Sequence, residues 1–134
     1  MEDYILRDIN RIGELIAALL NKIGLMRQSA SPEQIRTTAK TELAEKLDID
    51  IDTLLDEPDF IGRLTDEYGF GDQELDKFAE LLFDMAAASE QHERLRLAAA
   101  VGAIYSYLDA KKAPASLNRY YILKDLDKYI KEPQ

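Results

Sequence analysis

Four aspartates in the middle of the chain have a spacing that could bind a metal ion. Asp48, Asp50, Asp52 and Asp59 fall at positions 1, 3, 5 and 12 of a segment that can be aligned with an EF-hand calcium loop. Such a loop requires glycine at position 6 and a bidentate glutamate at position 12, where this chain has Thr53 and Asp59. These departures favour aspartates that cap helices and face solvent, with calcium binding as the alternative.

Side chains that could form a catalytic centre are few. The sequence has no cysteine, which excludes a thiolate nucleophile, a disulfide and a cysteine zinc site. His92 is the only histidine, and it lacks the Glu-x-x-His spacing that di-iron helical bundles use. No phosphate-binding glycine loop and no nucleophile elbow occurs. The sequence therefore predicts no catalytic residue and no cofactor, although carboxylates in an inter-helical pocket could still support catalysis or ligand binding.

The segment 41–55 has the spacing of a helix-turn-helix, but its charge argues against DNA binding. The second helix would present Asp50, Asp52, Asp56 and Glu57 to a groove lined with phosphates. Positive charge supplies most of the affinity in such complexes. We therefore expect no nucleic-acid partner.

Composition and net charge support the same conclusion. Apolar residues make up 46% of the 134 residues and charged residues 32%, so the chain can bury a core. With 17 basic and 26 acidic residues the net charge is −9, a surface that repels nucleic acids and anionic lipid headgroups. The N-terminus is acidic, and no apolar run approaches the roughly 18 residues of a membrane span. We expect a cytoplasmic protein with no membrane partner.

The elements that must position these residues are predicted to be helices throughout. Helical spacing of apolar residues recurs from end to end, whereas strand patterns are nearly absent. We expect a single all-α domain (residues 1–134) with six or seven helices, divided into N-terminal helices at 1–47, an acidic short-helix segment at 48–71 and a helical part at 72–134. Ser31, Asp72 and Ser116 are predicted helix caps.

The first helix, predicted over residues 2–28, carries a regular apolar stripe. Its members recur at intervals of four and three residues: Ile5, Ile9, Ile12, Ile16, Leu19 and Ile23. A stripe of this kind either enters the core of its own chain or binds a second copy. Neighbouring leucines widen the stripe, which favours the core, and a dimer stays the alternative.

Acidic charge is concentrated in one third of the sequence. Residues 48–84 hold 13 acids and 2 bases, while residues 1–47 are neutral and residues 85–134 carry a balance of +2. Like charges at this density repel unless a basic partner lies nearby. Asp50, Asp52, Asp56 and Glu57 are therefore candidate residues for steering a basic protein partner.

Five tyrosines lie in the last two predicted helices, namely Tyr105, Tyr107, Tyr120, Tyr121 and Tyr129. Tyrosine is favoured both where helices pack and at protein interfaces, because it joins a large apolar area to a polar tip. We expect packing for this group, because Tyr105 and Tyr121 share apolar helix faces, and contact with a partner is the alternative.

Two family resemblances arise from these patterns. Residues 72–131, with Met85, Ala98, Gly102 and Pro114, resemble a degenerate tetratricopeptide repeat followed by a closing helix, although no second repeat occurs at a 34-residue period. The resemblance implies a helical hairpin. The whole chain resembles a family of short bacterial all-helical proteins of unassigned function, through residues 3–9, 47–55, 81–83 and 105–109. This second resemblance implies the fold and a bacterial origin, and no activity.

Together these observations favour a small interaction or scaffold protein without catalysis. Its expected partner is another protein, and a second copy of the chain is one candidate for that partner. An enzyme or a small-ligand or metal-binding protein that uses inter-helical carboxylates is the alternative function.

Overall fold

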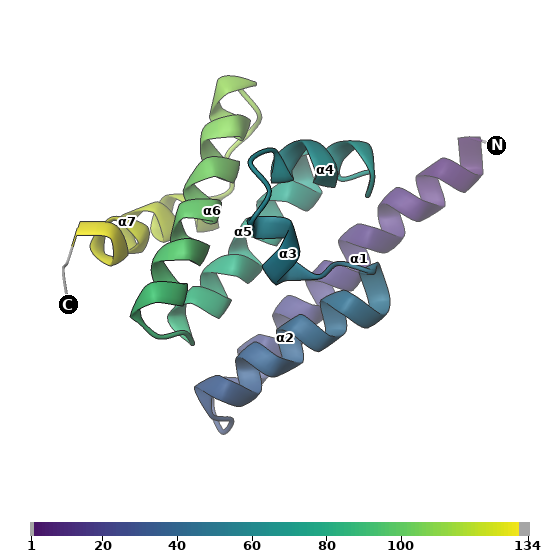
Figure 1. Ribbon diagram of the computed structural model, residues 1–134. Helices are drawn as coiled ribbons and strands as arrows, with labels where there is room; N and C mark the ends of the chain where they lie inside the picture. The colour runs from purple at the N-terminus through teal and green to yellow at the C-terminus, as the bar shows by residue number, and fades with distance from the viewer. Residues whose placement is uncertain (1, 132–134) are drawn as a thin grey trace.

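The computed structural model describes the backbone of residues 2–131 and the side chains of residues 11–129. Within this part of the chain, seven helices and no strands form one domain (Figure 1). The helices are α1 Glu2–Met26, α2 Pro32–Leu47, α3 Ile51–Leu55, α4 Phe60–Asp66, α5 Asp72–Ala87, α6 Gln91–Ala110 and α7 Leu117–Lys131. The all-α prediction is confirmed. None of the described helices combines the length and the apolar character that crossing a bilayer requires.

The apolar stripe of α1 lies largely in the core of its own chain. Its buried members are Ile16, Leu19 and Ile23. They lie where α1 packs against α2 and α5, and Ile12 is half-buried at the edge of this contact. The core packing that the sequence favours for this stripe is confirmed for these three side chains, and the alternative, an interaction surface for a second copy, is wrong for them. Ile5 and Ile9 lie outside the described side chains.

Local hydrogen bonds and backbone conformation set both ends of α2. The hydroxyl oxygen of Ser31 accepts a hydrogen bond from the Gln34 N–H at 3.2 Å, and the Gln34 side chain accepts one from the Ser31 N–H at 2.8 Å. This capping box begins α2 where the sequence predicts. At the other end Asp48 takes a left-handed conformation with φ of 57°, and α3 begins three residues later.

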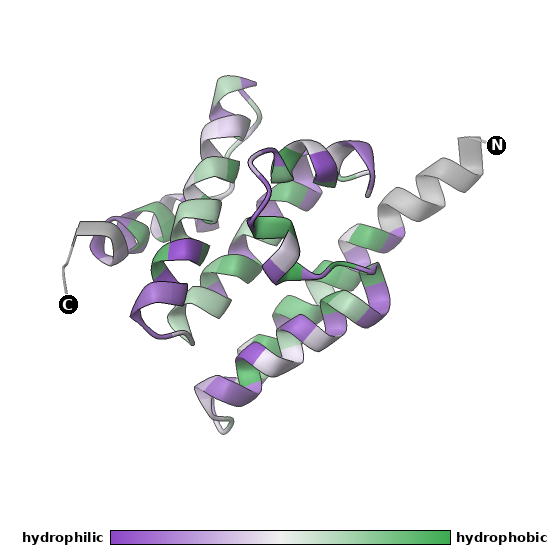
Figure 2. Ribbon diagram, in the orientation of Figure 1, coloured by the Kyte–Doolittle hydropathy of each residue, from purple (hydrophilic) through white to green (hydrophobic). Residues whose placement is uncertain are grey.

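The hairpin of α5 and α6 lies at the centre of the fold, and α7 packs against both helices. Figure 2 shows shades of green along much of α5 and α6 and a mixture of purple, white and green along α2. The buried side chains of α6 include Leu97, Val101, Ile104, Tyr105 and Leu108. Leu95 and Ala99, whose spacing also fits an apolar face of this helix, are exposed instead.

The start of α5 differs by one residue from the predicted cap. Gly71 is the N-cap, and Asp72 is the first helical residue. The carboxylate of Glu74 accepts a hydrogen bond from the Gly71 N–H at 2.9 Å, and Gly71 has no side chain that could accept from the first turn of α5. At α7 the expected cap is confirmed, because the Ser116 hydroxyl oxygen accepts from the Arg119 N–H at 3.1 Å.

Candidate interaction surfaces

The aspartates of the calcium-like segment act mainly as helix caps. Asp50 accepts hydrogen bonds from the Thr53 N–H at 3.4 Å and the Thr53 hydroxyl at 3.0 Å, at the start of α3. These bonds lower the pKa of Asp50. Asp59 accepts from the Gly62 N–H at 3.2 Å at the start of α4. Among the described residues, no three His, Cys, Asp or Glu side chains are grouped so as to hold a metal ion.

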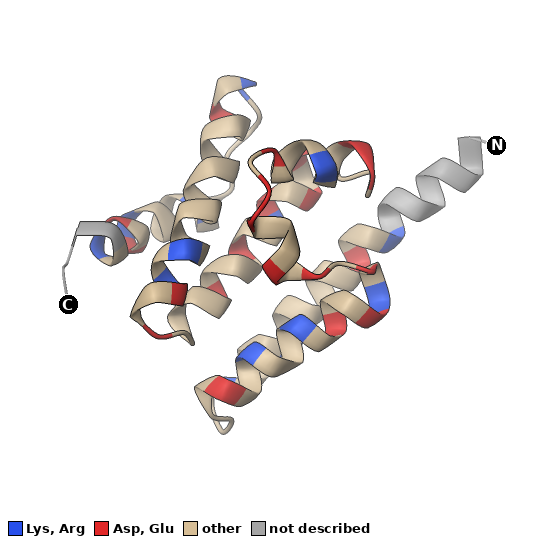
Figure 3. Cartoon of the chain, viewed as in Figure 1, with Lys and Arg blue, Asp and Glu red and all other residues tan. Residues whose placement is uncertain are grey.

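The other acids around α3 contact bases of neighbouring helices. Arg96 of α6 donates hydrogen bonds to Asp56 at 2.7 Å and to Asp52 at 3.3 Å. Lys40 of α2 donates to Asp52 at 3.3 Å. Figure 3 shows acidic segments running from the end of α2 through α3 toward α4, with basic segments of α2 and α6 on either side. Asp52 and Asp56, two of the acids that a recognition helix would present to DNA, thus contact bases of the same chain.

Further acids of the middle third are paired in the same way. Glu57 and Glu67 both contact Arg63 of α4. Three pairs reach bases of the outer thirds, namely Asp72 with Lys111, Asp76 with Arg119 and Asp84 with Arg27. The sequence predicts a basic partner for the acidic charge of residues 48–84. Basic side chains of the same chain already contact several of these acids. Steering of an external basic protein stays a prediction.

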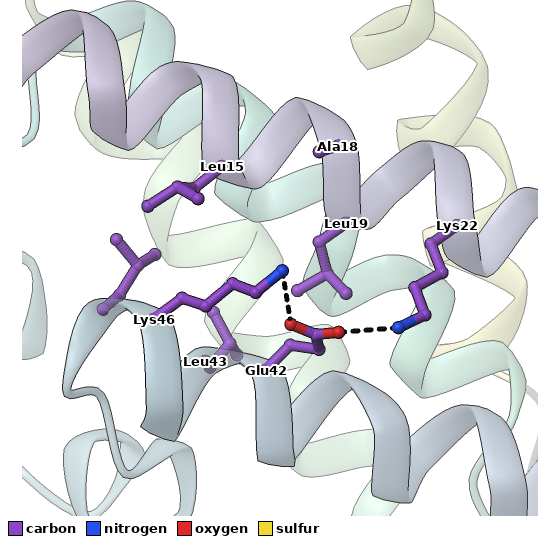
Figure 4. A pocket seen from close by; sticks show the side chains of 8 residues that line it. Leu15, Ala18, Leu19, Lys22, Glu42, Leu43 and Lys46 are labelled. Atoms are coloured by element: carbon purple, nitrogen blue, oxygen red, sulfur yellow. Dashed lines mark hydrogen bonds and ion pairs between the residues drawn. The ribbon is translucent and has the colours of Figure 1, made fainter.

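A small pocket of about 120 Å³ lies between α1 and α2 (Figure 4). Its apolar lining consists of Leu15, Ala18, Leu19, Leu43 and Leu47. Glu42 bridges the two helices, with 2.6 Å from Lys22 Nζ to Oε1 and 2.9 Å from Lys46 Nζ to Oε2. Hydrogen bonds from both ammonium groups lower the pKa of Glu42, so its carboxylate stays ionised at neutral pH.

A wider groove of about 370 Å³ continues from this pocket toward the end of α2. We call it the α1–α2 groove, and its apolar lining consists of Ile12, Leu15, Leu47, Tyr68 and Phe70. Its charged lining consists of Arg11, Glu45, Lys46, Asp48 and Glu67. The Tyr68 hydroxyl donates to the Asp48 carbonyl at 3.1 Å and ties the loop after α4 to the end of α2. An apolar floor with a charged border suits an amphipathic helix.

A buried polar cluster joins α7 to α5 and α6. Arg119 is almost fully buried and donates to Asp109 at 2.9 Å and to Asp76 at 3.4 Å. Tyr105 lies beneath its guanidinium, and the Tyr105 hydroxyl has no partner among the described residues. Burial, with smaller contributions from Asp76 and Glu80, raises the pKa of Tyr105. Burial also raises the pKa of Glu80.

The outer face of α7 exposes large apolar side chains, and sequence patterns do not single them out. Their exposed fractions are 71% for Leu117, 56% for Tyr120, 55% for Tyr121 and 41% for Leu123. Tyr120 and Tyr121 meet edge to face, with ring centres 5.5 Å apart, and Lys124 lies over the Tyr120 ring at 5.0 Å. We call these four residues the α7 outer face. Packing, expected for all five late tyrosines, is wrong for Tyr120 and Tyr121.

His92 lies in the first turn of α6, where its side chain is exposed. Glu90, Glu93 and Leu95 line the same open surface depression. His92 is therefore a solvent-exposed side chain at the start of a helix. Neither carboxylate is held against the imidazole by a described hydrogen bond, so the geometry shows no acid–base pair.

Comparison with known proteins adds no relative. No protein-family model, curated protein or solved structure matches this chain. The resemblances to the tetratricopeptide repeat and to short bacterial helical proteins therefore remain hypotheses from sequence.

Proposed function

We propose that this protein is a protein-binding module without catalysis and that the α7 outer face is its binding surface. One observation carries the proposal: four large apolar side chains within seven residues of one helix are each more than two-fifths exposed. Monomeric soluble proteins rarely expose contiguous apolar patches larger than a few hundred Å², and such patches mark interaction sites. We also propose that the module acts in the cytoplasm, which the acidic, cysteine-free composition supports.

The spacing of the exposed residues supports a helix-in-groove mode of binding. Leu117, Tyr120 and Tyr121 stand at positions i, i+3 and i+4 of α7. These are the anchor positions with which an amphipathic helix enters a hydrophobic groove. Tyrosine is suited to this role because it offers a large contact area with few rotatable bonds. The partner would accordingly present an apolar groove wide enough for two aromatic rings.

The inner side of α7 holds the helix in place for such binding. Leu126 is buried in the core, and Arg119 is fixed by its bonds to α5 and α6. Phe83 of α5 stacks on Tyr129 with ring centres 5.5 Å apart. A surface on an ordered helix loses little conformational entropy on binding, which favours affinity.

Site-specific photo-crosslinking in the native cell tests this proposal. A benzophenone amino acid at position 121 should capture a defined protein partner. The same group at position 41, an exposed site on α2, serves as the matched control and should capture none. Capture at position 121 should fall at least tenfold when Leu117→Ser and Tyr120→Ser are added. Equal capture at both positions, or capture that survives the two serine changes, would contradict the proposal.

One observation favours a second candidate function, binding of a small ligand at carboxylates. Burial keeps the pKa of Glu80 above its usual range, next to Asp76 and the unpartnered Tyr105 hydroxyl. A partly buried carboxyl group beside an unpartnered phenol offers an acceptor and a donor to a polar ligand. A thermal-shift screen with divalent metals and small metabolites tests this alternative. A stabilising compound whose effect is lost in Glu80→Gln would support it.

A further inference from the structure

Two lysines continue the line of the α7 outer face toward the C-terminal end of the helix. Lys124 and Lys128 follow Leu117 by seven and eleven positions, which places all three on one side of α7. Their backbones lie about 10 and 16 Å beyond Leu117 along the helix axis. A groove that receives α7 from this side therefore meets Leu117, Tyr120 and Tyr121 at one end and ammonium groups at the other.

Both lysines are open to an external anion. Their side chains are exposed, and that of Lys128 is 70% exposed. In the described part of the chain no ion pair includes Lys124, whose ammonium lies over the Tyr120 ring at 5.0 Å. The Lys128 ammonium lies 4.0 Å from Asp125. An exposed pair at this distance contributes little, so a carboxylate of a partner can replace it at low cost.

The acids of α7 lie beside this line and not on it. Among residues 117–129 they are Asp125 and Asp127. Asp125 directly follows Lys124 and Asp127 directly precedes Lys128, so each acid points about 100° around the helix from its neighbouring lysine, and the two point in opposite directions. The line from Leu117 to Lys128 thus ends in positive charge that no acid on the same line offsets.

The end of the chain around α7 is basic, although the chain as a whole is acidic. Residues 111–129 hold five bases and two acids, whereas the net charge of the protein is −9. Lys111 and Arg119 are held by acids of α5 and α6, and the other three bases are exposed. Because salt screens charges beyond about 8 Å, an approaching partner responds mainly to this local surplus of cations.

We propose that the partner of the α7 outer face is an acidic protein whose apolar groove ends in carboxylates that pair with Lys124 and Lys128. This inference rests on the proposed function, because it names the chemistry of the partner that the same surface binds. The apolar side chains supply affinity, and the ion pairs fix the direction in which α7 lies in the groove.

The arrangement of charge favours such a protein over two other occupants. A helix that lies on an anionic membrane carries its cations on the face opposite its apolar side chains, whereas Lys124 and Lys128 are in line with Leu117. A second copy that met this surface through its own α7 would bring the same lysines together, and like charges across an interface disfavour association.

The first experiment compares photo-capture at position 121, in the native cell, between two variants of equal net charge. Lys124→Gln with Lys128→Gln removes two positive charges from the line. The control, Thr37→Asp with Thr41→Asp, adds two negative charges at exposed positions of α2. Capture of the partner should fall about tenfold in the glutamine variant and stay unchanged in the control. Equal capture by both variants would overturn the inference.

The same capture assay distinguishes this failure from failure of the proposed function. Capture that ignores the lysines but still depends on Leu117 and Tyr120 would overturn only the acidic partner. Capture that is absent, or that survives the serine changes at both of those positions, would contradict the proposed function itself. A photo-adduct with lipid, or with a second copy of this chain, in place of another protein would also overturn the acidic partner.

The second experiment identifies the groups that meet the lysines. Complexes captured at position 121 are purified and treated with a water-soluble carbodiimide, which joins an amine to a carboxylate in contact with it as an amide, with loss of water. Mass spectrometry of the digest should find Lys124 or Lys128 joined to an Asp or Glu of the captured protein. Lys111, whose ammonium lies 2.8 Å from Asp72, serves as the internal control. Detection of the Lys111–Asp72 link without any link from Lys124 or Lys128 to the partner would overturn the proposal.

Discussion

The guanidinium of Arg119 lies 5.3 Å from the centre of the Tyr105 ring, and both side chains are almost fully buried between α6 and α7. The Arg119 guanidinium and the Tyr105 hydroxyl differ in the hydrogen bonds that they make. Arg119 donates to Asp109 and Asp76, whereas the Tyr105 hydroxyl has no partner among the described residues. In this contact the Arg119 cation should stabilise the fold and the unpaired Tyr105 hydroxyl should destabilise it. Substitution of each residue can measure the two effects separately.

Removal of the Tyr105 hydroxyl should stabilise the protein. A buried hydroxyl without a hydrogen bond costs about 1 to 3 kcal/mol, and Tyr105→Phe keeps the ring that packs under Arg119. We expect the free energy of unfolding in urea to rise by about 1 kcal/mol. In the control Tyr68→Phe, which loses the hydrogen bond to the Asp48 carbonyl, it should fall. A loss of stability in Tyr105→Phe would mean that the hydroxyl is bonded after all.

The same phenol should make the protein sensitive to alkaline pH. Burial raises the pKa of Tyr105, so the folded protein keeps this proton at a pH where the unfolded chain loses it. The resulting stability is fully present below the unfolded pKa of about 10 and falls as pH rises above it. Urea titrations from pH 9 to 11 should therefore show a steeper decline for the wild type than for Tyr105→Phe. Parallel curves would contradict the raised pKa.

Loss of the Arg119 charge should loosen α7. Arg119→Met leaves Asp76 half-buried without its cation, and breaking such a pair costs about 3 kcal/mol. The free energy of unfolding should fall by about that amount, and amide exchange in α7 should accelerate before that in α5. Lys124→Met, which removes an exposed cation from the same helix, should leave both measurements nearly unchanged.

Local signals in the sequence predict the helices well because each signal acts within a few residues. The Ser31 capping box and the Ser116 cap mark the starts of α2 and α7, and the structure has hydrogen bonds at both. The spacing of Ile16, Leu19 and Ile23 predicts a buried stripe in the same way. These features depend on the period of the helix and on nearby donors, which the order of residues specifies.

The surfaces depend on contacts between distant residues, which the sequence alone does not specify. Both sides of α7 carry apolar residues, so its pattern does not show that Leu126 faces the core and Tyr121 faces solvent. Arg96 lies 44 positions from Asp52 in the sequence, and this ion pair gives one acid of the middle third a basic partner within the chain. The groove beside Leu47 arises only when α1, α2 and the loop after α4 come together.

Neutralisation of Glu80 should change how stability depends on acid pH. Burial raises the folded pKa of Glu80, so the folded protein binds an extra proton above the unfolded value of 4.5. This stability is present below pH 4.5 and is lost as pH rises through the folded pKa. Glu80→Gln removes that loss and keeps an oxygen for the Asn118 amide, which donates to Glu80 at 3.0 Å. The difference in the free energy of unfolding between Glu80→Gln and the wild type should therefore grow from pH 4 to 7. The control Glu33→Gln, at an exposed acid of α2, should show no such trend.

Substitution of Asp50 should separate capping from calcium binding. Asp50→Ala removes the acceptor for both Thr53 donors, so α3 should fray and the melting temperature should fall by a few degrees. Asp50→Asn keeps one side-chain oxygen as an acceptor, so its melting temperature should fall less than that of Asp50→Ala. Because hydrogen bonds from Thr53 lower the pKa of Asp50, the contribution of this cap to stability is present above pH 3.8 and is lost as pH falls through the folded pKa.

Millimolar calcium should shift none of these melting temperatures, because the cap already uses the Asp50 carboxylate. A calcium-dependent rise in the wild type that is absent from Asp50→Ala would instead show that the aspartates of this segment bind the cation.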